Sequence, residues 1–449
     1  MAYAARPAWR SPQVDLATFA GGAALALLGV ISGLLIGRFG APGGLFPGAV
    51  LALALTRYWV EAAPIAALLS AFVTTRVPGL AQASGISISD VLVSLATGLV
   101  LTQISFTRPL RRLLTVVAIY QLALLAPVVM SGTRTSYVEW LHRAELVGGA
   151  MLCGALIAQR GRALLALRLV AALAGFYAVV AIAAYARTRE AAYVLTLQKN
   201  GLGTLLMMVL LVVLYGPALL PPRWRWAFGG LLIGGIFASQ SRGAMVGAVA
   251  GVLVASLMGR RRGRLLRVVP VLLLAAGSLV YVYVDVQNRQ ANETEAEVEF
   301  SSTGTRAAYR DQSIAIWKGS PLTGAGLKIF NDPAQSLKGD PHNYVVLALA
   351  EGGLFGLFGV FWLQLGALET VRRHRSALTI AAVAVVIARA THGLFDVYWL
   401  GGTGSFCWIV VGMAVGSPWV PQPATLGTRQ SLSRSVQPAT AGLEKGTRC

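Results

Sequence analysis

Apolar runs recur along the whole chain, and short links between them carry most of the polar residues. A helix of roughly 20 apolar residues crosses the hydrocarbon core of a bilayer, and most of these runs approach that length. The pattern therefore predicts about 12–14 membrane-spanning helices. The clearest expected spans are 17–37, 88–106, 112–130, 145–159, 163–186, 201–220, 243–258, 266–286, 343–368, 377–397 and 402–419. We interpret the chain as an all-α, polytopic integral membrane protein.

One polar stretch is far longer than the other links. Residues 287–341 include a segment with an amphipathic helical pattern. We expect a helical extracytoplasmic loop here, within a single integral domain that covers residues 1–420. The tail, 421–449, is rich in Ser, Thr and Pro, so we expect a disordered cytoplasmic segment.

The composition excludes a soluble core. The chain is 56% hydrophobic and only 12% charged, whereas a soluble domain has about 25% charged residues. The formal net charge of +20 would suggest a nucleic-acid partner if the protein were soluble. Here most arginines occupy short links between apolar runs, which indicates membrane topology and contact with anionic lipids. We expect membrane lipids as partners and no nucleic acid.

The distribution of basic residues predicts which links face the cytoplasm. Five links carry dense basic runs: 108–112, 160–162, 223–225, 260–267 and 371–375. Two spans fit between each consecutive pair, so the positive-inside rule can place all five on the cytoplasmic side. The remaining links, 131–144, 187–199, 239–242 and 287–341, then face outward. This topology puts Arg242, Arg306 and His342 on the same, extracytoplasmic side.

His342 is the first candidate for chemistry. The sequence Asp340-Pro341-His342 is typical of an N-cap, a proline at the first helical position and a histidine on the first turn. The positive end of the helix dipole disfavours a charged imidazole there. A neutral imidazole is what a general base requires. The alternative is a histidine that only occupies the membrane interface.

Arg242 is a candidate phosphate ligand. Arg242 lies in the sequence SQSRGA, at a tight turn between two expected spans. An arginine near the membrane is costly unless it meets an anion or another partner, and its guanidinium can bind phosphate oxygens bidentately. The alternative is an interfacial arginine on backbone carbonyls. Arg306 lies on the amphipathic segment before Pro321, where a solvated helix face is the usual outcome.

Other polar residues on the expected outer side are supporting candidates. Arg389, His392 and Asp396 lie near the end of one expected span, at spacings that put them on one helix face. An Arg–Asp ion pair within a membrane is also explained by a purely structural role. A second basic group comprises Arg187, Arg189 and Lys199. These three could meet an anionic head group or only solvate their link.

Several familiar catalytic motifs are missing from the sequence. It contains no HExxH zinc motif, no Walker loop and no Gly-x-Ser-x-Gly elbow. Its three cysteines show no spacing that suggests zinc or a disulfide. We therefore expect no metal and no cofactor. If the chain is a transferase, arginines should neutralise the phosphates of its substrate.

The order of four motifs resembles the O-antigen ligase family. They are SxSRGA, Gly-x-Arg followed by PLTGAG, HNYVVLALAEGGLFGL and a late THGLFD. The resemblance extends over roughly residues 196–415, and the most specific part is the His342-Asn343 start with Glu-Gly-x-x-Gly-Leu downstream. The same superfamily includes O-antigen polymerases and protein O-oligosaccharyltransferases.

The resemblance implies an inverting, metal-independent glycosyltransferase of lipopolysaccharide biosynthesis in the bacterial inner membrane, with a periplasmic active site. Its donor would be a glycan on undecaprenyl diphosphate, and its acceptor a hydroxyl of lipid A-core, another glycan or a protein. By the same resemblance, His342 would activate the acceptor, while Arg242 and Arg306 would hold the diphosphate. Asn343, beside the motif histidine, is a supporting candidate.

Three functions remain open at this point. The first is an O-antigen ligase that joins the glycan to lipid A-core, and the second is a polymerase that extends the glycan. The third is a transporter, which would place broken helices and ionisable groups near the bilayer midplane. The polar motifs lie instead at expected helix ends on one side, which favours a transferase.

Overall fold

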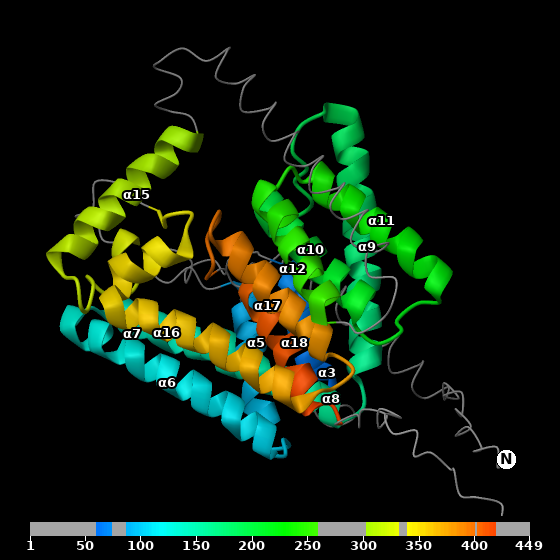
Figure 1. Cartoon of the computed structure of the whole chain (residues 1–449), viewed down its shortest axis with the longest axis horizontal. Helices are drawn as coiled ribbons and strands as arrows, with labels where there is room; N and C mark the ends of the chain where they lie inside the picture. The colour runs from blue at the N-terminus through cyan, green and yellow to red at the C-terminus, as the bar shows by residue number, and fades with distance from the viewer. Residues whose placement is uncertain (1–59, 74–86, 259–301, 332–338, 400–401, 419–449) are drawn as a thin grey trace, which may run out of the picture.

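The chain folds into helices throughout the part that the structure describes. The computed structural model describes residues 60–73, 87–258, 302–331, 339–399 and 402–418. Within these ranges the only β-type pairing is an isolated bridge between Val194 and Leu197. The prediction of an all-α polytopic membrane protein is confirmed (Figure 1).

The helices of the first half are α3 (Ala62–Leu69), η1 (Ser70–Phe72), α5 (Ile88–Leu101), α6 (Arg108–Ser131), α7 (Arg134–Ala144), η2 (Glu145–Gly149), α8 (Ala150–Gln159) and α9 (Ala163–Thr188). Those of the second half are α10 (Lys199–Tyr215), α11 (Pro222–Ala238), α12 (Arg242–Met258), α15 (Ser302–Gly319), η3 (Ile329–Asn331), α16 (Tyr344–His374), α17 (Thr379–Gly393) and α18 (Thr403–Gly416). In Figure 1, α6, α7 and α16 form one flank, and α9 to α12 form the other, with α17 and α18 between them.

Four helices in the described ranges are long and apolar enough to cross a membrane: α6, the continuous helix Arg134–Gln159, α9 and α16. Shorter apolar helices accompany them, among them α10, α12, α17 and α18. The expected spans 17–37 and 266–286 and the tail 421–449 lie outside the described residues. The total of about 12–14 spans therefore stays a prediction.

The predicted polar link at 131–144 is wrong in its local structure. Most of it is helix α7, which continues through the π-helical turn η2 into α8. Charged residues in this part interrupt the apolar pattern, which is why the sequence indicates a loop. Arg143 and Glu139 remain in the helix because they pair with each other, with 2.8 Å between Nε and Oε1.

Close contacts through glycine set the distance between α12 and α17. A Cβ atom on Gly247 would lie 2.7 Å from the Ala388 carbonyl oxygen, and one on Gly251 would lie 3.0 Å from that of Ala384. Small residues of this kind let membrane helices approach closely. The packing brings the start of α12 against the end of α17, where the late histidine and aspartate of the sequence lie.

Helix α16 is kinked at Gly353, whose backbone has φ 56° and ψ −147°. The kink leaves backbone N–H groups of the helix without acceptors inside the helix. The turn after α15 supplies carbonyl oxygens that accept from them. Leu354 and Phe355 donate their backbone N–H groups to the carbonyl oxygens of Pro321 and Leu322, at 3.0 and 3.2 Å. A Cβ on Gly353 would lie 2.4 Å from the Leu322 carbonyl, so glycine is required here.

The same turn continues along α16 through a second set of backbone bonds. Ala325 donates to the Ala350 carbonyl and Gly326 to that of Glu351, both at 2.9 Å. A Cβ on Gly324 would lie only 2.5 Å from the Glu351 carbonyl carbon, and the positive φ of Gly324 also favours glycine. The PLTGAG and EGG motifs are therefore two sides of one contact, which fixes the extramembrane segment to α16.

Candidate functional site

His342 immediately precedes the helix that the sequence placed it on. α16 begins at Tyr344, and Asn343 is its N-cap, with Oδ1 accepting from the N–H groups of Val345 and Val346 at 3.0 and 3.2 Å. The prediction that Asp340 caps the helix and that His342 lies on its first turn is therefore wrong. Asn343 binds the free N–H groups, and Asp340 is engaged elsewhere. His342 still lies close to the positive end of α16.

The His342 imidazole faces a carboxylate. Its Nε2 lies 4.0 Å from Asp396 Oδ1, an ion-pair distance that is longer than a hydrogen bond, and its side chain is 32% exposed. Burial, together with the charge of Arg306, lowers the pKa of His342, although Asp396 and Asp340 oppose this shift. The lowered pKa favours the neutral imidazole that a general base requires.

Asp396 also faces a second histidine. Its Oδ2 lies 3.7 Å from Nε2 of His392, which is buried at the end of α17. His392 Nδ1 lies 3.1 Å from an Arg389 guanidinium nitrogen, and a guanidinium can only donate, so Nδ1 accepts. The network thus assigns the ring proton to Nε2, which lies 2.9 Å from the Thr204 hydroxyl oxygen. Asp396 therefore bridges one partly exposed and one buried imidazole.

Arg389 is part of this support rather than of a pair with Asp396. It donates to the backbone carbonyls of Tyr398 and of Val397, the latter at 3.4 Å, and its guanidinium lies 4.6 Å from the centre of the Tyr398 ring. The expected Arg389–Asp396 ion pair is not among the ion pairs of the described residues. The expected single helix face fails because α17 ends at Gly393, before Asp396.

Arg242 begins α12 at the same end of the bundle. The glycine after it, Gly243, packs against the histidine and the loop that follow α17. A Cβ there would lie 3.1 Å from His392 Cδ2 and 3.2 Å from Phe395 Cβ. The glycine of the SRG motif thus allows the half-buried Arg242 and His392 to occupy neighbouring positions.

Arg306 lies on α15, outside the bundle, and is exposed. Its positive charge is among the causes that lower the pKa of His342, so the two residues are within electrostatic reach. The predicted residues Arg242, Arg306 and His342 therefore lie toward one end of the helices, where Asp396 and His392 also lie. Which face of the membrane this end occupies stays a prediction.

The remaining supporting candidates are placed less directly. Lys199 is the first residue of α10, whose Asn200 carbonyl accepts the Thr204 hydroxyl at 2.7 Å, so it lies near the same end. Arg187 and Arg189 are exposed at the end of α9. Within the described ranges, neither has a contact with His342 or Asp396. They remain candidates by sequence alone.

The sequence analysis missed Thr204 and a group of charged residues beside the site, of which Arg143, Glu139 and Glu351 are buried. Arg143 on α7 pairs with both Glu139 and Glu351, and Lys328 pairs with Asp340. Charged residues inside an apolar pattern, such as Glu351 in the EGG motif, were the signal that could have found this group. In the described part of the chain no three His, Cys, Asp or Glu side chains are placed to hold a metal ion. Metal independence stays a prediction.

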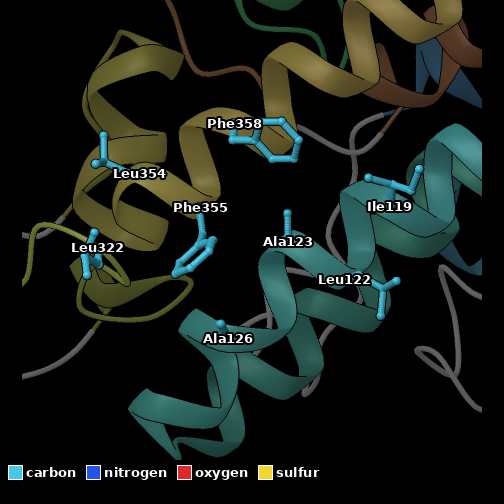
Figure 2. A pocket seen from close by; sticks show the side chains of 8 residues that line it. All are labelled: Ile119, Leu122, Ala123, Ala126, Leu322, Leu354, Phe355 and Phe358. Atoms are coloured by element: carbon cyan, nitrogen blue, oxygen red, sulfur yellow. The ribbon is translucent and has the colours of Figure 1, made fainter.

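An apolar groove lies beside the kink of α16. It measures about 530 Å³ and lies between α6 and α16, beside the turn that docks on the kink (Figure 2). Its lining is entirely apolar: Ile119, Leu122, Ala123, Ala126, Leu322, Leu354, Phe355 and Phe358. These side chains offer no group for acid–base chemistry.

One comparison with known proteins finds a similar family. Residues 227–361 match the family model described as O-Antigen ligase. The matched segment contains Arg242, Arg306, His342 and the Gly353 kink, and it ends before Asp396. A search of curated proteins finds no match. Over these residues, which are less than half of the chain, the protein is similar to the O-antigen ligase family.

Proposed function

We propose that this chain is an O-antigen ligase that acts on the periplasmic face of the bacterial inner membrane. It moves a glycan from undecaprenyl diphosphate to a hydroxyl of lipid A-core. The similarity of residues 227–361 to the O-antigen ligase family supports glycan transfer from a lipid-linked substrate. The observation that carries the proposal is the meeting of His342, Asp396 and Arg306 at one end of the helices, beside the start of α12 at Arg242.

The reaction needs one base and one anion site. An acceptor oxygen attacks the anomeric carbon from the face opposite the diphosphate, and a new C–O bond forms as the bond to the diphosphate oxygen breaks. The electron pair of that bond leaves with undecaprenyl diphosphate, and the hydroxyl proton passes to His342. Attack from the opposite face inverts the anomeric centre.

Asp396 and the arginines act on the charges that develop in this step. His342 becomes positive as it takes the proton, and the Asp396 carboxylate at 4.0 Å stabilises that charge. The diphosphate gains negative charge as it leaves, and guanidinium groups bind its oxygens through bidentate hydrogen bonds. Arg242 and Arg306 perform this role in our proposal.

Reconstitution with a choice of acceptors tests the function. The purified chain in liposomes is given an undecaprenyl diphosphate-linked glycan together with either lipid A-core or a second lipid-linked glycan. We expect glycan on lipid A-core, measured by mass spectrometry, and no product from His342→Gln. Elongation of the lipid-linked glycan instead would support the polymerase. If a folded protein transfers glycan to neither acceptor, the ligase and polymerase functions are both contradicted, and the transporter function is favoured.

Cysteine labelling tests the orientation. Cys153 and Cys407 are buried, so a variant in which serine replaces Cys449 should show little maleimide labelling of its own. We expect Lys318→Cys, at the exposed end of α15, to react with an impermeant maleimide added to the periplasmic side. The matched control is Arg372→Cys, exposed at the other end of α16, which should react only after permeabilisation. The reverse pattern would overturn the periplasmic site.

A further inference from the structure

A chain of charged side chains connects the bundle to the segment that carries His342. Lys328 Nζ lies 3.1 Å from Asp340 Oδ2, and the Lys328 backbone N–H donates to Glu351 Oε1 at 2.8 Å. Glu351 pairs in turn with Arg143, and Arg143 with Glu139. The chain therefore runs from α7, across α16, to a position two residues before His342.

The inner part of this chain is fixed by burial. The side chains of Arg143, Glu139 and Glu351 are only 1–3% exposed. A buried ion pair is strongly destabilised when one partner is lost, because the other charge is left unpaired. Glu351 is therefore a rigid acceptor for the Lys328 backbone.

Lys328 itself adopts a backbone conformation that non-glycine residues rarely take, with φ 58°. Such a conformation persists only where neighbouring contacts determine it, and it is concentrated at functional sites. Two contacts hold it here. Glu351 accepts the Lys328 N–H, and the preceding carbonyl, of Leu327, accepts the Ser136 hydroxyl at 3.0 Å. The ammonium group is thereby directed at Asp340.

We propose that Lys328 is a positioning residue for His342. It holds Asp340, and hence the peptide that leads into His342, at a fixed place above the start of α16. It also neutralises the Asp340 carboxylate, so that this charge does not keep the histidine protonated. This inference rests on the proposed role of His342 as the base, and it assigns Lys328 no contact with substrate.

The charges that face His342 allow the neutralising function of Lys328 to be tested by the sign of a pKa shift. Arg306 on α15 lowers the pKa of His342, whereas Asp396, after α17, and Asp340 raise it. His392 lies on the far side of Asp396. Lys328 pairs with Asp340, so its removal leaves an unpaired carboxylate close to the histidine. The pKa of His342 should then rise. As the pH falls, the imidazole should therefore become protonated, and stop acting as a base, at a higher pH than in the unchanged chain.

The test compares variants of the purified full chain. We expect Lys328→Met to raise the pKa of His342 by about 0.5–1 unit and to move the acidic limb of the transfer rate upward by the same amount. Asp340→Asn should move both in the opposite direction. The double variant should resemble Asp340→Asn, because the carboxylate on which the lysine acts is gone. Lys328→Arg should keep the pKa of the unchanged chain.

Lys318→Met is the matched control, because it removes the same charge from the exposed end of α15. Histidine NMR measures the pKa of His342 directly: the chain has four histidines, and His342→Gln identifies the signal. This readout does not need glycan transfer, so it separates failure of this inference from failure of the proposed function. A shift with Lys328→Met no larger than with Lys318→Met, in a folded protein, would overturn the role of Lys328. If that variant does not fold, Asp340→Asn leaving the His342 pKa unchanged would do so.

Discussion

Two groups of charged side chains lie near the start of α16, and they are held very differently. Arg143 and its two glutamates are 1–3% exposed and in direct contact, with 2.8 Å between Arg143 and Glu139. His342 is 32% exposed, and 4.0 Å separates it from Asp396. The first group is almost completely shielded from solvent. The second is partly open to solvent, and its histidine faces a carboxylate.

The comparison shows how one helix start serves two purposes. The tight group, which is Arg143, Glu139 and Glu351, fixes the position of the backbone through Glu351 and the segment that docks on the kink. The loose pair, which is His342 and Asp396, leaves its histidine able to change charge. Removing a member of the tight group should therefore reduce stability, and removing a member of the loose pair should reduce activity without changing stability.

The largest expected effect is on transfer by His342→Gln. General base catalysis contributes about 10²–10⁴-fold to a rate, so we expect a loss of about 10³-fold or more in kcat. The apparent melting temperature should stay within about 2 °C of the unchanged chain, because the side chain is partly exposed and makes no short contact among the described residues. Rate and melting temperature are measured on the same purified sample. Transfer at more than about a tenth of the normal rate would remove His342 as the base.

The opposite result is expected for Glu351→Gln in the tight group. This change leaves Arg143 with only one carboxylate and should destabilise the protein by about 3–5 kcal/mol, as for other buried pairs that lose a partner. Thermal unfolding in detergent measures the effect. Glu369→Gln is the control, because Glu369 lies on the same helix and pairs with Arg372 and Arg373 at the surface, where ion pairs contribute about 0–1 kcal/mol. Equal melting temperatures for the two variants would contradict the comparison.

The sequence predicted the helical class and the gathering of polar motifs at helix ends, because apolar length and arginine distribution are local properties. It failed where two local signals competed, since Asp340 and Asn343 are both good N-caps. In the structure Asn343 caps α16, and Asp340 pairs with Lys328. The charge of Glu351 within an apolar pattern was visible in the sequence, but its partner Arg143 was not predictable, because it lies 208 residues away. The sequence indicated Asp396 as a candidate but paired it with Arg389. That pairing is wrong because α17 ends before Asp396, which instead faces His342 and His392.

A smaller effect is expected from Asp396→Asn, which keeps shape and removes one charge. Asp396 raises the pKa of His342, so its removal lowers that pKa and moves the acidic limb of the transfer rate to lower pH. Without the carboxylate, the charged imidazole is less stable, and we expect kcat to fall by about 10–100-fold at neutral pH. The pH profile from about 5 to 9 measures both. An unchanged acidic limb would mean that Asp396 acts on His392 alone.

The smallest predicted change is the shift caused by Arg306→Gln, and its sign is opposite to that of Asp396→Asn. The guanidinium lowers the pKa of His342, so its loss should raise that pKa and move the acidic limb upward, by roughly 0.5 unit for an exposed charge. Arg310→Gln is the matched control on the same helix, because Arg310 is exposed and pairs with Asp311 at 2.9 Å. If Arg306 also binds the diphosphate, Arg306→Gln but not Arg310→Gln should raise the KM for the lipid-linked donor. Added salt should weaken the effect of Arg306 on the pKa of His342 in the unliganded protein. A rise in KM without any shift would leave Arg306 as a diphosphate ligand that does not act on the base.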